Sequence, residues 1–137
     1  ANMATYPPAT EVGDVVVHCI RRNISEADEG LGALVIGTRP AKSIVVSAGV
    51  IVTTGFNGTS PIAQIGPTAD PDGFGTNLIL ATIGNIVWDE LATSNDLYST
   101  SEVTDTVTVS ATGNDSTAGY GVAYVLYVLN NGNGRTS

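Results

Sequence analysis

Two segments of the chain alternate between apolar and polar positions. In residues 43–54 the even positions are apolar, among them Val46 and Val50, while several odd positions are Ser, Gly or Thr. In residues 102–112, Val107 and the other apolar side chains alternate with Thr and Ser. Successive side chains of a strand point to opposite faces of its sheet. This period of two therefore predicts two half-buried strands, with the even positions of the first on its apolar face.

Shorter apolar runs predict the remaining strands, and Gly or Pro residues mark the turns between them. The expected strands are residues 12–20, 33–38, 61–66 and 118–129, with residues 78–88 forming one bent strand or two short ones. The Asn57-Gly58 pair favours a turn from which residues 61–66 return as a strand. Composition also predicts a polar connection over residues 21–32, an irregular segment over 67–77 and a helical turn within 89–100.

Composition supports an all-β fold. The 137 residues include 16 Val, 10 Ile and 17 Thr, and such β-branched side chains fit a pleated sheet better than a helix. We therefore predict a single-domain antiparallel β-sandwich over residues 12–129, with a jelly roll as one form of it. Residues 1–11, which contain Pro7 and Pro8, are expected to form an extended arm, and residues 130–137 a flexible tail.

The predicted last strand, residues 118–129, differs from the others because both of its faces are apolar. Tyr120, Val122 and Tyr124 share one face, and Tyr127 lies on the other. A sandwich strand with one solvated face alternates apolar and polar residues instead. Two explanations stay open: a loop screens the outer face, or that face docks against another subunit.

Net charge argues against nucleic acid as a partner, and the short apolar runs argue against a membrane. Five Lys and Arg against thirteen Asp and Glu give a formal net charge of −8. Phosphate binding depends on clustered cations, so nucleic acid is not an expected partner. No apolar run approaches the length of about 18 residues that would span a bilayer, and the first residues lack the apolar core of a signal peptide. We therefore expect no membrane association.

Residues with chemical potential are few. With one Cys and one His, the chain has no internal disulfide and no multi-histidine metal site. His18 and Cys19 are adjacent on a predicted strand, so their side chains diverge and do not form a nucleophile–base pair. Cys19 is expected to be a small core residue and His18 a partly exposed one. We predict that the protein is not an enzyme and needs no cofactor or metal.

Two further features allow a binding role beside a purely structural one. Asp70 and Asp72 resemble the start of a calcium loop, but the position of the bidentate ligand is Ala81, and a simple Pro-Asp-Gly turn is the preferred interpretation. Whether this loop binds an ion stays open. Trp88 is a residue type that stacks on sugar rings, although an aromatic residue within an apolar strand is more often part of a core.

Two stretches of the sequence carry a family resemblance. They are residues 36–77 and 113–129, and the matching positions are mostly turn residues: Gly37, Pro40, Phe56, Asn57, Gly58, Gly66, Asp70, Gly73, Gly119 and Tyr127. The order of an FNG loop, a DPDG-type loop and a Gly-rich turn before the last strand resembles that of small β-sandwich structural proteins of tailed bacteriophages. Arg39 and Lys42-Ser43 depart from the pattern, which often has Leu and Gly-Ala at these positions.

The resemblance, which covers somewhat under half of the chain, implies a virion structural protein. Its expected role is that of a head decoration, or cement, protein that binds the capsid exterior and bridges subunits of the major capsid protein. Relatives of this kind are often trimers. The extended arm and the doubly apolar last strand would then supply intersubunit contacts, and the candidate residues are Tyr6, Pro7, Pro8, Tyr120, Val122, Tyr124 and Tyr127.

Other functions are compatible with the same fold. A phage tail or baseplate component, including a receptor-binding tip, would differ only in its location in the virion. A carbohydrate-binding module would use Trp88.

Overall fold

The computed structural model describes residues 16–88, 91 and 104–129. They form a β-sandwich, which confirms the predicted fold class. Its strands are β2 (His18–Ser25), β3 (Leu34–Arg39), β4 (Ser43–Thr54), β5 (Ile62–Pro67), β6 (Gly75–Ile79), β7 (Gly84–Val87), β8 (Asp105–Thr112) and β9 (Tyr120–Leu129). A 3-10 turn, η2 (Glu26–Asp28), follows β2. Among the described residues there is no α-helix. The predicted arm and tail, residues 1–11 and 130–137, lie outside the described residues.

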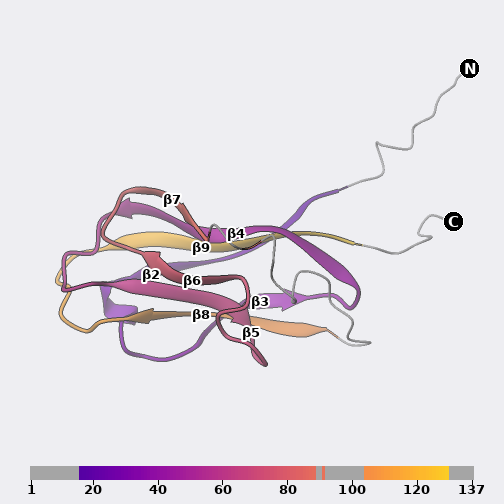
Figure 1. Ribbon diagram of the computed structural model, residues 1–137, viewed down its shortest axis with the longest axis horizontal. Coiled ribbons are helices and arrows are strands. Elements are labelled where there is room, and N and C mark those ends of the chain that lie inside the picture. Colours follow the sequence, from indigo (N-terminus) through magenta and orange to yellow (C-terminus); the bar gives the residue numbers. More distant parts are fainter. Residues whose placement is uncertain (1–15, 89–90, 92–103, 130–137) are drawn as a thin grey trace, which may run out of the picture.

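Two four-stranded antiparallel sheets make up the two layers (Figure 1). One sheet has the order β2-β9-β4-β7 and the other the order β3-β8-β5-β6. Consecutive strands alternate between the sheets, except for the neighbours β5 and β6. The predicted return of residues 61–66 beside residues 43–54 is therefore wrong, because β5 pairs with β6 and β8 in the opposite sheet.

The core lies between the layers and is almost entirely aliphatic. Both sheets contribute strand residues with at most 1% exposure, including Val50 and Val125 from one sheet and Ile65 and Val109 from the other. Phe56 and Phe74, which lie in connections, are also buried within this core. Alternation along β8 places Val107, Val109 and Ala111 inside, as the sequence predicted.

Strand β4 has the predicted bounds but not the predicted faces. A β-bulge between Val45 and Ser47 inserts one extra residue opposite β9. Side chains before the bulge are buried at odd positions, and those after it are buried at even positions. As a result Val45 lies in the core, whereas Val46 is 51% exposed. The prediction that all even positions share one face is wrong because a bulge reverses the parity of a strand.

Strand β2 lies later in the chain than predicted. The strand begins at His18 and continues through Ser25, so the polar connection expected over residues 21–32 is wrong in its first five residues. Polar side chains such as Arg21 and Asn23 are compatible with β2 because it is an edge strand with one exposed face. Of the strand expected over residues 12–20, the part up to residue 15 lies outside the described residues.

The other predicted elements agree more closely with the structure. Strands over residues 33–38 and 118–129 are confirmed as β3 and β9. Residues 78–88 hold the last two residues of β6 and the whole of β7, so the alternative of two strands is closer to the structure, and the two strands lie in different sheets. The irregular segment expected over residues 67–77 is shorter, since β6 begins at Gly75. The helical turn expected within residues 89–100 falls outside the described residues except for Leu91.

Candidate functional site

The outer face of the β2-β9-β4-β7 sheet is an apolar surface, and it is the face for which the sequence allowed either a screening loop or a docked subunit. Strand β9 lies between β2 and β4, and its Ala123 and Val125 are fully buried in the core. Alternation turns the even-numbered residues outward, and three of them, Val122, Leu126 and Val128, are half-buried. We call this outer face the apolar sheet face.

Neighbouring strands extend the apolar sheet face on both sides of β9. Register places Ile51 beside Val122, and Ile44 beside Val128. Ile51 and Val87 are 44% and 42% exposed, respectively. The face therefore presents aliphatic side chains from three adjacent strands. A contiguous apolar patch of this kind is typical of an interaction surface rather than of a solvated sheet.

Tyr124 is held in the middle of this face. Its hydroxyl donates a hydrogen bond to Oδ1 of Asn85 on β7, with an oxygen–oxygen distance of 2.8 Å. Between these two strands, Gly49 of β4 pairs with both Tyr124 and Val87. A Cβ atom on Gly49 would lie 2.4 Å from the carbonyl oxygen of Ile86, so only glycine fits here. The hydrogen bond and the close approach fix the tyrosine as part of a preformed surface.

The candidate contact residues divide between the two faces of β9. Tyr120, Val122 and Tyr124 belong to the apolar sheet face, and Tyr120 is 39% exposed. Tyr127 points to the inner side, where its ring stacks on His18 with a centroid distance of 5.2 Å. The remaining three candidates, Tyr6, Pro7 and Pro8, lie outside the described residues.

His18 and Cys19 diverge as predicted, and His18 is partly exposed as expected, but the prediction that Cys19 is a core residue is wrong. The side chain of Cys19 is exposed, and its register partner on β9 is Leu126. It thus belongs to the apolar sheet face and not to the core. His18 is instead stacked on Tyr127 on the inner side. Val17, at the same parity as Cys19, is exposed as well, so the odd positions at the start of β2 face away from the core.

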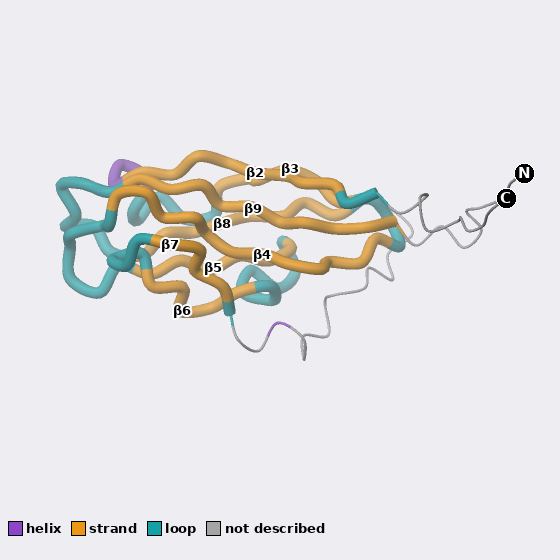
Figure 2. The backbone as a smooth tube through the Cα atoms, turned by 90° about the horizontal axis from the view of Figure 1, so that it is seen from above, coloured by secondary structure: helices purple, strands orange, loops and turns teal. Residues whose placement is uncertain are grey.

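Loops lie together at one end of the sandwich (Figure 2). A hydrogen-bond network that the sequence did not reveal joins three of them. Glu29, which is 7% exposed, accepts hydrogen bonds from the backbone nitrogen and the hydroxyl of Ser116, at 3.1 and 2.8 Å. Asn57 Oδ1 accepts from the backbone nitrogens of Thr117 and Ala118. The Asn-Gly pair therefore anchors the loop before β9 and does not form a hairpin turn.

Gly58 allows these loops to approach closely. A Cβ atom there would lie 2.2 Å from Oδ1 of Asp115, whose carboxylate accepts a hydrogen bond from Thr59 N. This network orients the loop that precedes Tyr120 and is structural, since its polar groups are engaged with one another.

The loop that contains Asp70 and Asp72 is the other cluster singled out by the sequence. Hydrogen bonding to Asp70 raises the pKa of Asp72 above its ordinary value of 3.8, and burial and repulsion from Asp70 act in the same direction. Two carboxylates that share a site disfavour a second negative charge. In the part of the chain that the structure describes, no group of three or more His, Cys, Asp or Glu residues is placed to hold a metal ion.

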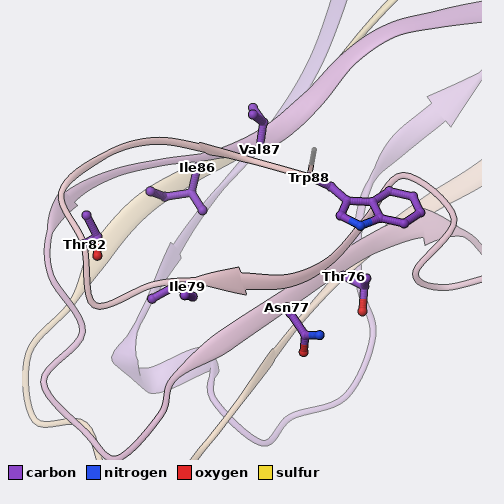
Figure 3. A pocket seen from close by; sticks show the side chains of 7 residues that line it. All are labelled: Thr76, Asn77, Ile79, Thr82, Ile86, Val87 and Trp88. Atoms are coloured by element: carbon purple, nitrogen blue, oxygen red, sulfur yellow. The ribbon is translucent and has the colours of Figure 1, made fainter. Parts of the chain in front are cut away.

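An open groove of about 550 Å³ lies between the edge strands β6 and β7 (Figure 3). Its lining is Thr76, Asn77, Ile79, Thr82, Ile86, Val87 and Trp88. Trp88 is half-buried and packs against the core. In Figure 3 its ring lies near Thr76 and Asn77, which supply polar groups beside an aromatic surface.

Within the described ranges, no helix has the length and apolar character needed to cross a bilayer.

Comparisons with known proteins give one informative similarity. No protein-family model matches the chain, and no curated protein matches its sequence. Among solved structures, the chain is similar to a chain of the cyanophage Pam1 capsid asymmetric unit, with a TM-score of 0.64 and 14% sequence identity. The alignment covers 94% of this chain and 94% of that one, so the two are of similar length. At this identity the similarity establishes a shared fold.

Proposed function

We propose that this chain is a structural component of a bacteriophage head, and specifically a decoration protein that binds the exterior of the shell. The observation that supports this most directly is the shared fold with a chain of the Pam1 capsid asymmetric unit over 94% of both chains. Because the alignment leaves few residues unmatched in either chain, a small β-sandwich like this one is enough to serve as a component of a capsid.

The strand order supports a jelly-roll arrangement. Counted from β2, the first, eighth, third and sixth strands form one sheet, and the second, seventh, fourth and fifth form the other. Jelly rolls are double sheets of eight strands and occur in viral capsid proteins. Such a fold supplies a rigid body with two broad faces, one of which here is apolar.

The proposed mechanism is thermodynamic rather than catalytic. A protein that contacts neighbouring capsid subunits at once adds binding free energy only in the assembled shell, because the contact requires both subunits in place. The major capsid protein is the proposed partner, and a homotrimer is the proposed oligomer. Among the described residues, we assign Tyr120, Val122 and Tyr124 to the contact with capsid subunits, so the homotrimer would form through other surfaces.

Binding to heads tests this proposal. Expanded heads that lack the protein are incubated with purified chain, sedimented and analysed for bound protein. Cryo-electron microscopy of the same sample then locates it. We expect saturable binding on the exterior and higher resistance of the heads to heat and low salt. Heads that neither bind the chain nor gain resistance, or a map that places it in the tail, would refute the decoration role.

A second candidate function, glycan binding, is favoured by the groove between β6 and β7. Trp88 is half-buried there beside the polar side chains of Thr76 and Asn77. Aromatic rings with adjacent polar groups are suited to the apolar faces and hydroxyls of sugars. A glycan array tests it directly, with tryptophan fluorescence as a second readout because Trp88 is the chain's one tryptophan. An array without hits would eliminate this function.

A further inference from the structure

We infer that the apolar sheet face binds a different protein rather than a second copy of this chain, and that the partner brings a carboxylate to Arg21. The inference rests on the proposed function, which supplies the partner: the capsid shell. It adds the chemistry of the contact and the orientation of the sandwich on the shell.

Arg21 is the single charged side chain among the described residues of the apolar sheet face. It is exposed, and its register partner on β9 is the central Tyr124. No hydrogen bond or ion pair joins it to any described residue. Its neighbours on β2 that share this face, Cys19 and Asn23, are uncharged.

Carboxylates lie elsewhere in the described structure. Glu26, Asp28 and Glu29 are in or next to η2, and Asp115 is in the loop before β9. Asp70 and Asp72 are in the loop between β5 and β6. Asp105 is at the start of β8 in the other sheet, and its Oδ2 lies 3.6 Å from Nε of the buried Arg39. The described residues therefore place no negative charge on this face, although the chain has a net charge of −8. This distribution suits a surface that becomes buried.

Charge complementarity decides between the two kinds of partner. If two copies packed with their apolar sheet faces together, each would bring an arginine and neither would bring a carboxylate among the described residues. A guanidinium that loses water without gaining an anion is costly to bury. A different protein with an acidic side chain opposite Arg21 turns this cost into a charge-assisted hydrogen bond and gives the contact its specificity.

The opposite face of the sandwich supports this orientation. On the outer side of the β3-β8-β5-β6 sheet, the residues that point outward are mostly polar: Thr38, Gln64, Thr106, Ser110 and Thr112, together with the apolar Val35, Ile62 and Ile79. Hydroxyl and amide groups remain hydrated at low cost. The apolar sheet face thus points to the shell and the hydroxyl-rich face to solvent.

Two variants with the same change in net charge test the inference. Arg21→Gln removes the proposed ion pair, and Thr38→Glu is the matched control on the opposite, solvent-facing side. Each variant and the wild-type chain are titrated onto heads that lack the protein, at several salt concentrations. Melting curves establish that both variants are folded. We expect Arg21→Gln to bind at least about 10-fold more weakly with a reduced salt dependence, and Thr38→Glu to bind like wild type.

Cys19 supplies an independent readout because it is the chain's only cysteine and lies exposed on the apolar sheet face. Alkylation of the wild-type thiol is timed in the free protein and in head-bound protein. Protection in the bound state, with no effect of protein concentration on the free state, supports the inference. Protection that appears in the free protein as its concentration rises would show self-association through this face and overturn the inference.

The outcomes separate the two claims. If wild type does not bind heads, the proposed function fails and the inference fails with it. If wild type binds while Arg21→Gln binds equally well, the proposed function survives and the inference is refuted. The same conclusion follows if Cys19 stays as reactive on heads as in solution, since the apolar sheet face would then be uncovered.

Discussion

Removal of the Glu29 carboxylate is expected to destabilise the protein through one loop. Glu29 is almost fully buried, and it accepts two hydrogen bonds from Ser116, one from the backbone nitrogen and one from the hydroxyl. The Ser116 hydroxyl oxygen also accepts a hydrogen bond from Gly58 N at 2.9 Å. Glu29→Ala leaves the donors of Ser116 without their acceptor in a partly buried position.

The expected loss in the free energy of unfolding follows from the two hydrogen bonds that Ser116 donates and from the buried charge of Glu29. A hydrogen bond to a charged group contributes about 1.5 kcal/mol or more, so two such bonds contribute about 3 kcal/mol. Removing a buried carboxylate also relieves its desolvation cost, so the loss is smaller than the sum of the two bonds and falls in the range of about 1–3 kcal/mol that an unsatisfied buried donor costs. The net loss in the free energy of unfolding is then about 2 kcal/mol. With an unfolding entropy of about 2.1 cal/mol/K per residue, 137 residues convert this loss into a decrease in Tm of about 7 °C.

Glu29→Gln is the matched control, because its amide retains an acceptor for Ser116 N and offers a donor to the hydroxyl. We expect thermal melts at neutral pH to show Glu29→Gln within about 3 °C of wild type and clearly above Glu29→Ala. Hydrogen exchange should show faster exchange of the Ser116 amide in the alanine variant. Equal melting temperatures for the alanine variant and wild type would refute the role assigned to these bonds.

Three further perturbations have defined outcomes. Gly119 has a φ of +155°, and Gly119→Ala places a Cβ about 2.5 Å from the Phe56 ring. We expect chemical denaturation to show a free energy of unfolding about 3 kcal/mol lower than that of wild type. Tyr124→Phe removes the hydroxyl that joins β9 to β7, which should cost about 1 kcal/mol and accelerate hydrogen exchange in β7. Asp72→Asn should raise Tm at pH 7 by no more than about 2 °C. The pKa of Asp72 is raised by Asp70, so its charge is unfavourable above that pKa and the gain should vanish as the pH falls toward 4.

Each of these has a control. Gly32 also has a positive φ, but a Cβ there meets nothing within 4 Å, so Gly32→Ala should cost only about 1 kcal/mol. An equal loss at both glycines would contradict the proposed clash. Asn85→Ala should reproduce the effect of Tyr124→Phe, and the double variant should add little more. A stability gain for Asp72→Asn that is the same at pH 4 and pH 7 would show that repulsion from Asp70 is not its cause.

Local pattern was sufficient to predict the architecture. The period of two in β4 and β8 and the apolar run of β9 depend on how one strand places its own side chains, and neighbours in sequence carry that information. The doubly apolar character of β9 likewise indicated a central strand with a covered or docking outer face. Of the candidate contact residues described by the structure, three lie on that face and Tyr127 does not.

Pairing between distant segments decided which sheet each strand joins and which of its side chains face outward. Such pairing depends on register and on close approach in three dimensions. The bulge at Val46 exists only opposite β9, and it reverses the parity of β4. The assignment of β5 to the opposite sheet turned Asn57 from an expected hairpin residue into an anchor for the loop before β9. Composition alone assigned Arg21 to a loop. Among the described residues it is the single charge on the apolar sheet face, and this place follows from the pairing of β2 with β9, which side-chain patterns within either strand do not encode.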